Sequence, residues 1–144
     1  MTRIFIAASL LSCLAGAALA QGAMTGAMKP LDAVPFEPDA DVACLASALE
    51  TGDASTGPST WILKAPAGCL VPWHSHTAQE QLLVVSGAVI AEMTDHPSTL
   101  LGAGGFAMME GHMTHQFTCQ GTAACVMFVS FDKAYDIKWG KTGR

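Results

Sequence analysis

The chain has 144 residues, of which 51% are hydrophobic and 13% are charged, and its formal net charge at pH 7 is −5. This length is enough for one domain with its own core. The seven lysines and arginines form no cluster along the sequence, which excludes the basic surface typical of a nucleic-acid-binding protein.

The first twenty residues have the organisation of a secretory signal peptide. Arg3 gives a positive start, residues 4–18 are almost continuously apolar, and Ala18-Leu19-Ala20 is a small-residue cleavage site. The apolar run is shorter than the ~20 residues that a spanning helix needs. We therefore expect cleavage after Ala20, a periplasmic or secreted protein, and no membrane attachment after cleavage. Lipoprotein processing at Cys13 is the alternative, although little apolar sequence precedes that cysteine.

Residues 21–58 are predicted to form an N-terminal arm with a short helix. The arm, residues 21–41, is rich in Gly, Ala, Met and Pro, which favours an extended or partly flexible segment. Residues 41–50 (DVACLASALE) carry apolar side chains at helical spacing, so a short helix or turn is expected there. The Gly-, Ser- and Thr-rich residues 51–59 are predicted to form a loop.

Residues 59–144 are predicted to form an all-β sandwich or barrel. Short β-prone runs follow one another closely, turn residues separate them, and no long helical pattern intervenes. The expected strands are residues 60–65, 70–76, 80–86, 88–93, 99–101, 106–109, 115–119, 124–131 and 135–139.

Four cysteines remain after the predicted cleavage, and four cysteines allow three pairings. Cys119 and Cys125 flank a predicted hairpin turn, where opposed positions come within disulfide distance. We therefore favour Cys119–Cys125, which leaves Cys44–Cys69. Because an exported protein meets an oxidising environment, bridges are expected there. The alternative is four buried free thiols that act as small hydrophobic groups.

Two histidines and a glutamate form the most informative pattern in the chain. His74 and His76 are two residues apart, so a strand would direct both imidazoles to one face. A turn followed by a second strand would bring Glu80 to the same point. Imidazole and carboxylate ligands together are typical of a transition-metal site.

This segment resembles the first conserved motif of the cupin superfamily, in which spaced glycines bracket His-X-His and Glu. The matching positions are Gly68, His74, His76, Glu80 and Gly87. A second, weaker match to the family's other motif places Gly111 and His115 at their usual positions, whereas Met109 replaces Pro and Cys119 replaces Asn.

The resemblance implies a double-stranded β-helix (jelly-roll) barrel with a metal ion inside its mouth. It assigns the ion to His74, His76, Glu80 and His115. Three imidazoles and one carboxylate suit one divalent ion of Fe, Mn, Zn, Ni or Cu. A metal that prefers six ligands then keeps two positions for water, dioxygen or a chelating substrate.

Several alternatives to these assignments remain open. The two histidines of the motif could lie on an exposed edge strand, and Gln79 or Gln81 could replace Glu80. A reduced, inward-facing Cys119 could be a fifth ligand. Among the other histidines, His112 is a candidate catalytic or substrate-contacting residue beside Glu80, or simply an exposed loop residue, and His96 is expected to be structural.

Alternation along the predicted strands indicates which side chains enter the barrel. Leu82 and Val84 share the face of Glu80, and Phe117 and Cys119 share that of His115. The residues expected at the mouth are Trp73, Gln79, Met93 and Met108 or Met109. The pocket is therefore expected to be apolar and to lack an arginine, the usual partner of a doubly anionic substrate.

Three functions fit this site. The first is a mononuclear metal-dependent oxidoreductase, dioxygenase-like, in which Glu80 also serves as a base. The second is a metal-dependent isomerase or lyase, with acid/base help from His112 or Glu110. The third is a non-enzymatic module that binds a small ligand or the metal itself. A homodimer is also expected, because the family often dimerises and a small barrel leaves strand edges to cover.

Overall fold

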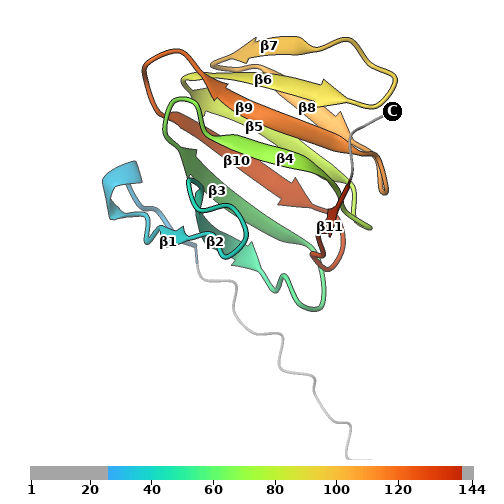
Figure 1. Ribbon diagram of the computed structural model, residues 1–144. Coiled ribbons are helices and arrows are strands. Elements are labelled where there is room, and N and C mark those ends of the chain that lie inside the picture. The colour runs from blue at the N-terminus through green and yellow to red at the C-terminus, as the bar shows by residue number, and fades with distance from the viewer. Residues whose placement is uncertain (1–25, 141–144) are drawn as a thin grey trace, which may run out of the picture.

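The computed structural model describes residues 26–140, which form two antiparallel β-sheets packed face to face (Figure 1). One sheet has six strands in the order β1 (Glu37–Pro38), β2 (Ala46–Gly52), β3 (Ser59–Ala65), β10 (Cys125–Phe131), β5 (Glu80–Ser86) and β8 (Phe106–Met109). The other has five, in the order β11 (Lys138–Trp139), β4 (Leu70–Ser75), β9 (His115–Gln120), β6 (Ala88–Met93) and β7 (Thr99–Gly102).

The core lies between the two sheets and follows from residue alternation along the strands. In β5 the buried Leu82 and Val84 alternate with exposed residues, and in β9 the buried Phe117 and Cys119 alternate with half-buried residues. Burial of one large apolar side chain contributes about 1.5–3 kcal/mol, so these inward faces hold the sheets together. The predicted all-β architecture and these four inward positions are confirmed. Each predicted strand has a counterpart, but the last, predicted over residues 135–139, is only Lys138–Trp139.

The helix predicted over residues 41–50 is wrong. Strand β2 begins at Ala46 and pairs antiparallel with β3, with Ala46 opposite Lys64, and the described part of the chain contains no helix except the 3-10 turn Leu31–Ala33. A short apolar run fits a helix or a strand locally, and here pairing with β3 overrides the helical spacing. Two strands of the six-stranded sheet, β1 and β2, therefore lie within residues 21–58, the segment predicted as an arm with a short helix.

Both predicted disulfides are present. Cys44 is bonded to Cys69, and Cys119 to Cys125. Cys119 is therefore no free thiol and is not a fifth metal ligand. The two bridges are in keeping with an oxidising, extracytoplasmic location. The predicted signal peptide and Cys13 lie outside the described residues, and within residues 26–140 no helix is long and apolar enough to cross a membrane.

The two glycines that bracket the first motif have the same backbone conformation but different surroundings. Gly68 and Gly87 have φ values of 81° and 79°, a left-handed conformation that costs an L-residue about 1–2 kcal/mol. A Cβ at Gly68 would meet nothing within 4 Å, whereas at Gly87 it would lie 2.8 Å from the Ala124 carbonyl oxygen. The absence of a Cβ at Gly87 thus lets the turn between β5 and β6 lie directly against the backbone of Ala124 and Cys125.

Gly87→Ala is therefore expected to lower the free energy of unfolding by about 3 kcal/mol, since strain and a backbone clash combine. Gly68→Ala should cost only about 1 kcal/mol, because it adds the strain alone. Chemical denaturation of both variants measures the difference. Equal losses would contradict the role of the Ala124 contact.

Candidate metal centre

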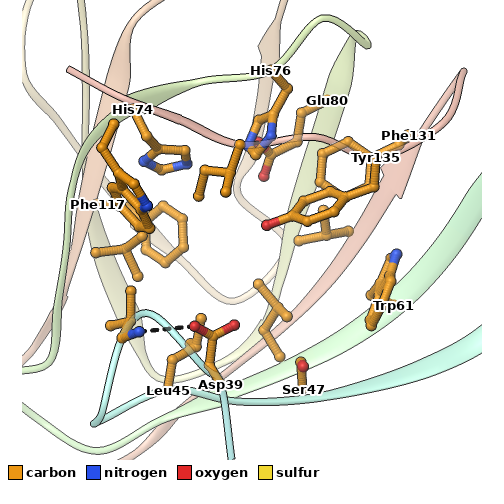
Figure 2. A pocket seen from close by; sticks show the side chains of 16 residues that line it. Asp39, Leu45, Ser47, Trp61, His74, His76, Glu80, Phe117, Phe131 and Tyr135 are labelled. Carbon is orange, nitrogen blue, oxygen red and sulfur yellow. Dashed lines mark hydrogen bonds and ion pairs between the residues drawn. The ribbon is translucent and has the colours of Figure 1, made fainter. Parts of the chain in front are cut away.

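Four polar side chains converge between the two sheets at one end of the barrel. His74 lies in β4 opposite His115 of β9, His76 directly follows β4, and Glu80 begins β5 in the facing sheet. Each of the four is at least 96% buried, and one ligand atom from each lies within 4.8 Å of the others. Figure 2 shows His74, His76 and Glu80 together on one side of a pocket. The structure thus brings together all four predicted ligands.

Each histidine is oriented by a backbone carbonyl. The Nδ1 of His74 lies 2.6 Å from the Pro72 oxygen, and that of His115 lies 2.9 Å from the Met113 oxygen. His76 Nδ1 pairs in the same way with the carbonyl of Asp136. A carbonyl only accepts, so every Nδ1 must carry the proton, and each neutral ring presents an unprotonated Nε2. This tautomer is the one that binds a metal through Nε2.

The donor atoms at the centre lack the partners that buried polar atoms normally have. Glu80 Oε2 lies 3.2 Å from His76 Nε2 and 3.1 Å from His115 Nε2. Among the described residues, however, neither Glu80 Oε2 nor His115 Nε2 is in hydrogen-bonding geometry with a partner. Unsatisfied buried groups carry a cost of about 1–3 kcal/mol each. One cation would satisfy all four donors, so these residues fit a divalent transition metal.

The cluster shifts the pKa values of its own members. Burial, and then the nearby His115, lower the pKa of His74 to about 4. Burial works to raise the pKa of Glu80, but His115 and His76 outweigh it and lower the pKa to about 2. For His76, burial is outweighed by Glu80 and by the Asp136 carbonyl, which raise its pKa above 6.5. Without metal, Glu80 is therefore ionised near neutral pH, and His76 holds a proton more readily than a free imidazole does.

Metal binding is consequently expected to release a proton. Because Glu80 outweighs burial and raises the pKa of His76, its ring holds a proton more readily than a free imidazole does, and a ligand must be deprotonated to bind. Zinc titration at about pH 6.5 should therefore release protons, and the number released per ion should fall as the pH rises. Calorimetry in buffers of different ionisation enthalpy measures it. Binding at pH 6.5 with no proton release would contradict this account.

A C-terminal segment that follows β10 supports the site from outside. The Asp136 carboxylate accepts hydrogen bonds from the Thr77 backbone N–H at 2.6 Å and from its hydroxyl at 2.7 Å, while the Asp136 carbonyl accepts from His76. Next to it, β11 pairs with β4 at His74. Sequence reasoning missed Asp136, and only the predicted strand at 135–139 indicated that this segment belongs to the barrel.

Two of the candidate residues from the sequence lie apart from the site. The side chains of His112 and Glu110 are exposed and do not line the pocket. His112 contributes through its backbone instead, since its N–H donates to the His76 carbonyl at 2.7 Å. Gln81 and His96 are also exposed, and His96 does not belong to the cluster.

The cavity beside the cluster has a volume of about 120 Å³ and walls different from those predicted. None of the residues expected at the mouth (Trp73, Gln79, Met93, Met108 and Met109) lines it. Its lining residues are Asp39, Val42, Leu45, Ser47, Trp61, Leu63, Val71, His74, His76, Glu80, Phe117, Val129, Phe131, Tyr135, Ile137 and Trp139. The predicted apolar pocket is wrong, because Asp39 and Ser47 line the cavity. Both arginines of the chain, Arg3 and Arg144, lie outside the described residues.

Tyr135 is the lining residue that sequence reasoning most clearly missed. Its hydroxyl points into the cavity (Figure 2), and its ring centroid lies 5.3 Å from that of His76. Burial raises the pKa of Tyr135, and the carboxylates of Asp39 and Glu80 raise it further. The phenol therefore stays protonated around neutral pH and can donate a hydrogen bond to a molecule in the cavity.

Fold and site together define a small jelly-roll protein whose barrel holds a metal-site-like cluster of three histidines and one glutamate. Residues 61–131 match the family model described as a cupin domain. The chain belongs to the cupin superfamily, which confirms the resemblance seen in the sequence. Among curated proteins, none matches the sequence significantly.

Solved structures show the same fold. The DMSP lyase DddQ from Ruegeria pomeroyi is 19% identical with a TM-score of 0.61, and the match covers 67% of this chain and 52% of that one. Oxalate oxidase in complex with glycolate is 22% identical with a TM-score of 0.54, covering 58% and 46%. An uncharacterized protein from Klebsiella pneumoniae with a double-stranded beta-helix domain is 14% identical with a TM-score of 0.67, covering 82% and 100%. The chain thus spans about half the length of the two named enzymes.

Proposed function

We propose that this protein is an exported, mononuclear metal-dependent oxidoreductase, dioxygenase-like, that acts on a small organic molecule. The observation that carries the proposal is that the buried cluster opens directly onto a cavity, which His74, His76 and Glu80 help to line. At about 120 Å³ the cavity is smaller than the ~300–1,000 Å³ of drug-sized sites, so the substrate is small. The disulfides and the predicted signal peptide support action in the periplasm or outside the cell.

The residues around the cavity would have three roles: holding the metal, excluding water and accepting a proton. His74, His76, Glu80 and His115 would hold the ion, which supplies positions for a chelating substrate and dioxygen and stabilises charge that develops there. The carbonyls that orient the imidazoles keep the donors in place without rearrangement. Apolar walls such as Phe117 exclude water, and Glu80 can accept a proton from the substrate.

The test is oxygen consumption by the protein with a defined metal. Metal analysis after purification without a chelating tag identifies the ion, and the emptied protein is then reloaded with iron or manganese. Oxygen uptake coupled to loss of a catechol, diketone or flavonol is expected for substrates small enough for the cavity. A His115→Ala variant provides the matched control. Failure over the whole panel, with metal bound, would count against the oxidoreductase.

A metal-dependent lyase or isomerase is the second candidate, and one observation favours it. That chemistry needs an acid or base besides the metal, and the Tyr135 hydroxyl points into the cavity, whereas the exposed His112 and Glu110 do not line it. A product formed without oxygen uptake, at a rate that Tyr135→Phe lowers, would favour this candidate. Full occupancy by zinc without turnover would instead favour a binding module.

We also propose that the protein forms a homodimer through the outer face of the six-stranded sheet. Phe128 pairs in register with Ile62 and Leu83, and Leu83 pairs with Phe106. Leu83, Phe106 and Phe128 are 39%, 55% and 38% exposed. A continuous apolar row of this kind indicates an interaction surface, and it can pair with its own copy across a two-fold axis.

Replacing Leu83 and Phe128 with glutamate is expected to convert the dimer into a monomer, because two copies would then bring four carboxylates together. Size-exclusion chromatography with light scattering measures the mass. Leu100→Glu is the matched control, since Leu100 is exposed but lies in β7 of the other sheet. A monomeric wild type would remove the proposal.

A further inference from the structure

Acidic side chains face the cavity with no lysine or arginine of the described residues to balance them. Within residues 26–140, its lining includes the carboxylates of Asp39 and Glu80 but no lysine or arginine. Glu80 belongs to the metal cluster and would be neutralised by a bound cation. Asp39 lies on the side of the cavity opposite the histidines (Figure 2), so the metal would not satisfy it. An anionic group at that side would meet an uncompensated carboxylate.

Asp39 has one carboxylate oxygen committed to the fold and one that is available. Oδ1 accepts the backbone N–H groups of Asp41 at 2.9 Å and Val42 at 2.8 Å. These bonds fix the carboxylate so that it faces the cavity (Figure 2). Within residues 26–140, Oδ2 accepts no hydrogen bond from another residue. A fixed negative charge with a free oxygen is suited to a positively charged group.

Aromatic rings line the cavity between Asp39 and the cluster. The ring centroid of Tyr135 lies 6.1 Å from that of Trp61 and 5.1 Å from that of Phe131. The Trp61 indole N–H donates to the Ser59 hydroxyl at 3.0 Å, which holds the ring in place. Aromatic faces carry negative partial charge and attract cations, most strongly where water is excluded. Aromatic rings beside a carboxylate are a characteristic site for alkylammonium groups.

We infer that the half of the cavity bounded by Asp39, Trp61, Phe131 and Tyr135 binds an alkylammonium group. The substrate is then a small zwitterion, whose cationic end lies against these residues and whose carboxylate or other oxygen donor faces the metal cluster. This inference deepens the proposed function and rests on it only for the oxygen-donor end. The cationic end depends on residues outside the cluster.

Calorimetric titration of the zinc-loaded protein tests the inference with two ligands of nearly equal shape. Trimethylammonioacetate carries the cationic group, and 3,3-dimethylbutanoate replaces its nitrogen with carbon. The zwitterion is expected to bind at least about tenfold more tightly, because cation–π and charge attraction act on it alone. Equal or tighter binding of the carbon analogue would overturn the inference.

Asp39→Asn should weaken binding of the zwitterion about tenfold and leave binding of the carbon analogue unchanged. Asparagine keeps the side-chain oxygen that accepts the two N–H groups, and thermal unfolding checks that the variant folds. Asp41→Asn is the matched control, because Asp41 is exposed on the same loop and does not line the cavity. The role of Asp39 would be contradicted if Asp41→Asn lost the preference for the zwitterion over the carbon analogue, or if Asp39→Asn kept that preference.

A third titration separates this inference from the proposed function. Tetramethylammonium has no oxygen donor. In metal-free protein it therefore tests only the half of the cavity that is proposed to bind the alkylammonium group. If tetramethylammonium binds and Asp39→Asn weakens this binding about tenfold, the alkylammonium site is supported. This result holds even if no metal binds or no turnover is found. If zinc binds but tetramethylammonium does not, and the zwitterion is not preferred over its carbon analogue, the metal site stands and the alkylammonium site is rejected.

Discussion

Replacing His76 with alanine is expected to lower the metal affinity roughly 100- to 1,000-fold. Zinc sites built from four protein ligands bind with about 10–16 kcal/mol, so one ligand contributes on the order of a quarter of this. The loss is not offset locally, because among the described residues no other His, Cys, Asp or Glu belongs to the cluster. Metal analysis after purification and competition with a chromogenic chelator measure the change.

His112→Asn is the matched control for this variant. His112 is the other histidine near the second motif, but its side chain is exposed, and asparagine tolerates its positive φ of 70°. The control should keep its metal. In wild type, metal at 100 times its dissociation constant should add about 2.7 kcal/mol to the stability, and the His76 variant should gain far less. Undiminished metal content in His76→Ala would show that the site is misassigned.

Removing the Cys44–Cys69 disulfide is expected to have the second large effect, on stability and on the cavity. The bridge spans a sequence separation of 25, and closing a loop of that length restricts the unfolded chain by about 3.5 kcal/mol. It also ties the segment that carries Asp39, Val42 and Leu45 to the start of β4. Replacing both cysteines with alanine should lower the free energy of unfolding by that amount and weaken ligand binding in the cavity.

The Cys119–Cys125 bridge provides the comparison. Its sequence separation is 6, for which the same chain-entropy argument gives about 2.4 kcal/mol. It lies away from the lining residues, so its removal should leave ligand binding unchanged. Urea denaturation and calorimetric titration of both double variants measure the two effects. An equal loss of ligand binding in both would contradict a local role for Cys44–Cys69.

The ligand cluster was predictable because its members belong to patterns with short spacing. His74 and His76 share a face through the two-residue period of a strand, and the spacing to Glu80 fits one turn. Cys119 and Cys125 flank a short turn as predicted, but the turn joins β9 and β10 of different sheets, so the bridge links the two sheets and the predicted hairpin is wrong. The segment at 41–50 shows the limit of this reasoning. Its apolar spacing fits a helix, and only the ladder with β3 makes Ala46–Gly52 a strand.

The sequence by itself therefore determined the all-β class, the four residues of the metal-site-like cluster and the disulfide pairing, since each depends on periodicity, on turns or on a family motif. Only the tertiary structure decided the walls of the cavity. Asp39 comes from a loop before β2, and Tyr135 comes from a segment that follows β10. Long-range contacts, such as that of His76 with Asp136 60 residues away, bring these segments to the cavity. The periodicity of neighbouring residues does not predict such contacts, because they depend on how one sheet packs on the other.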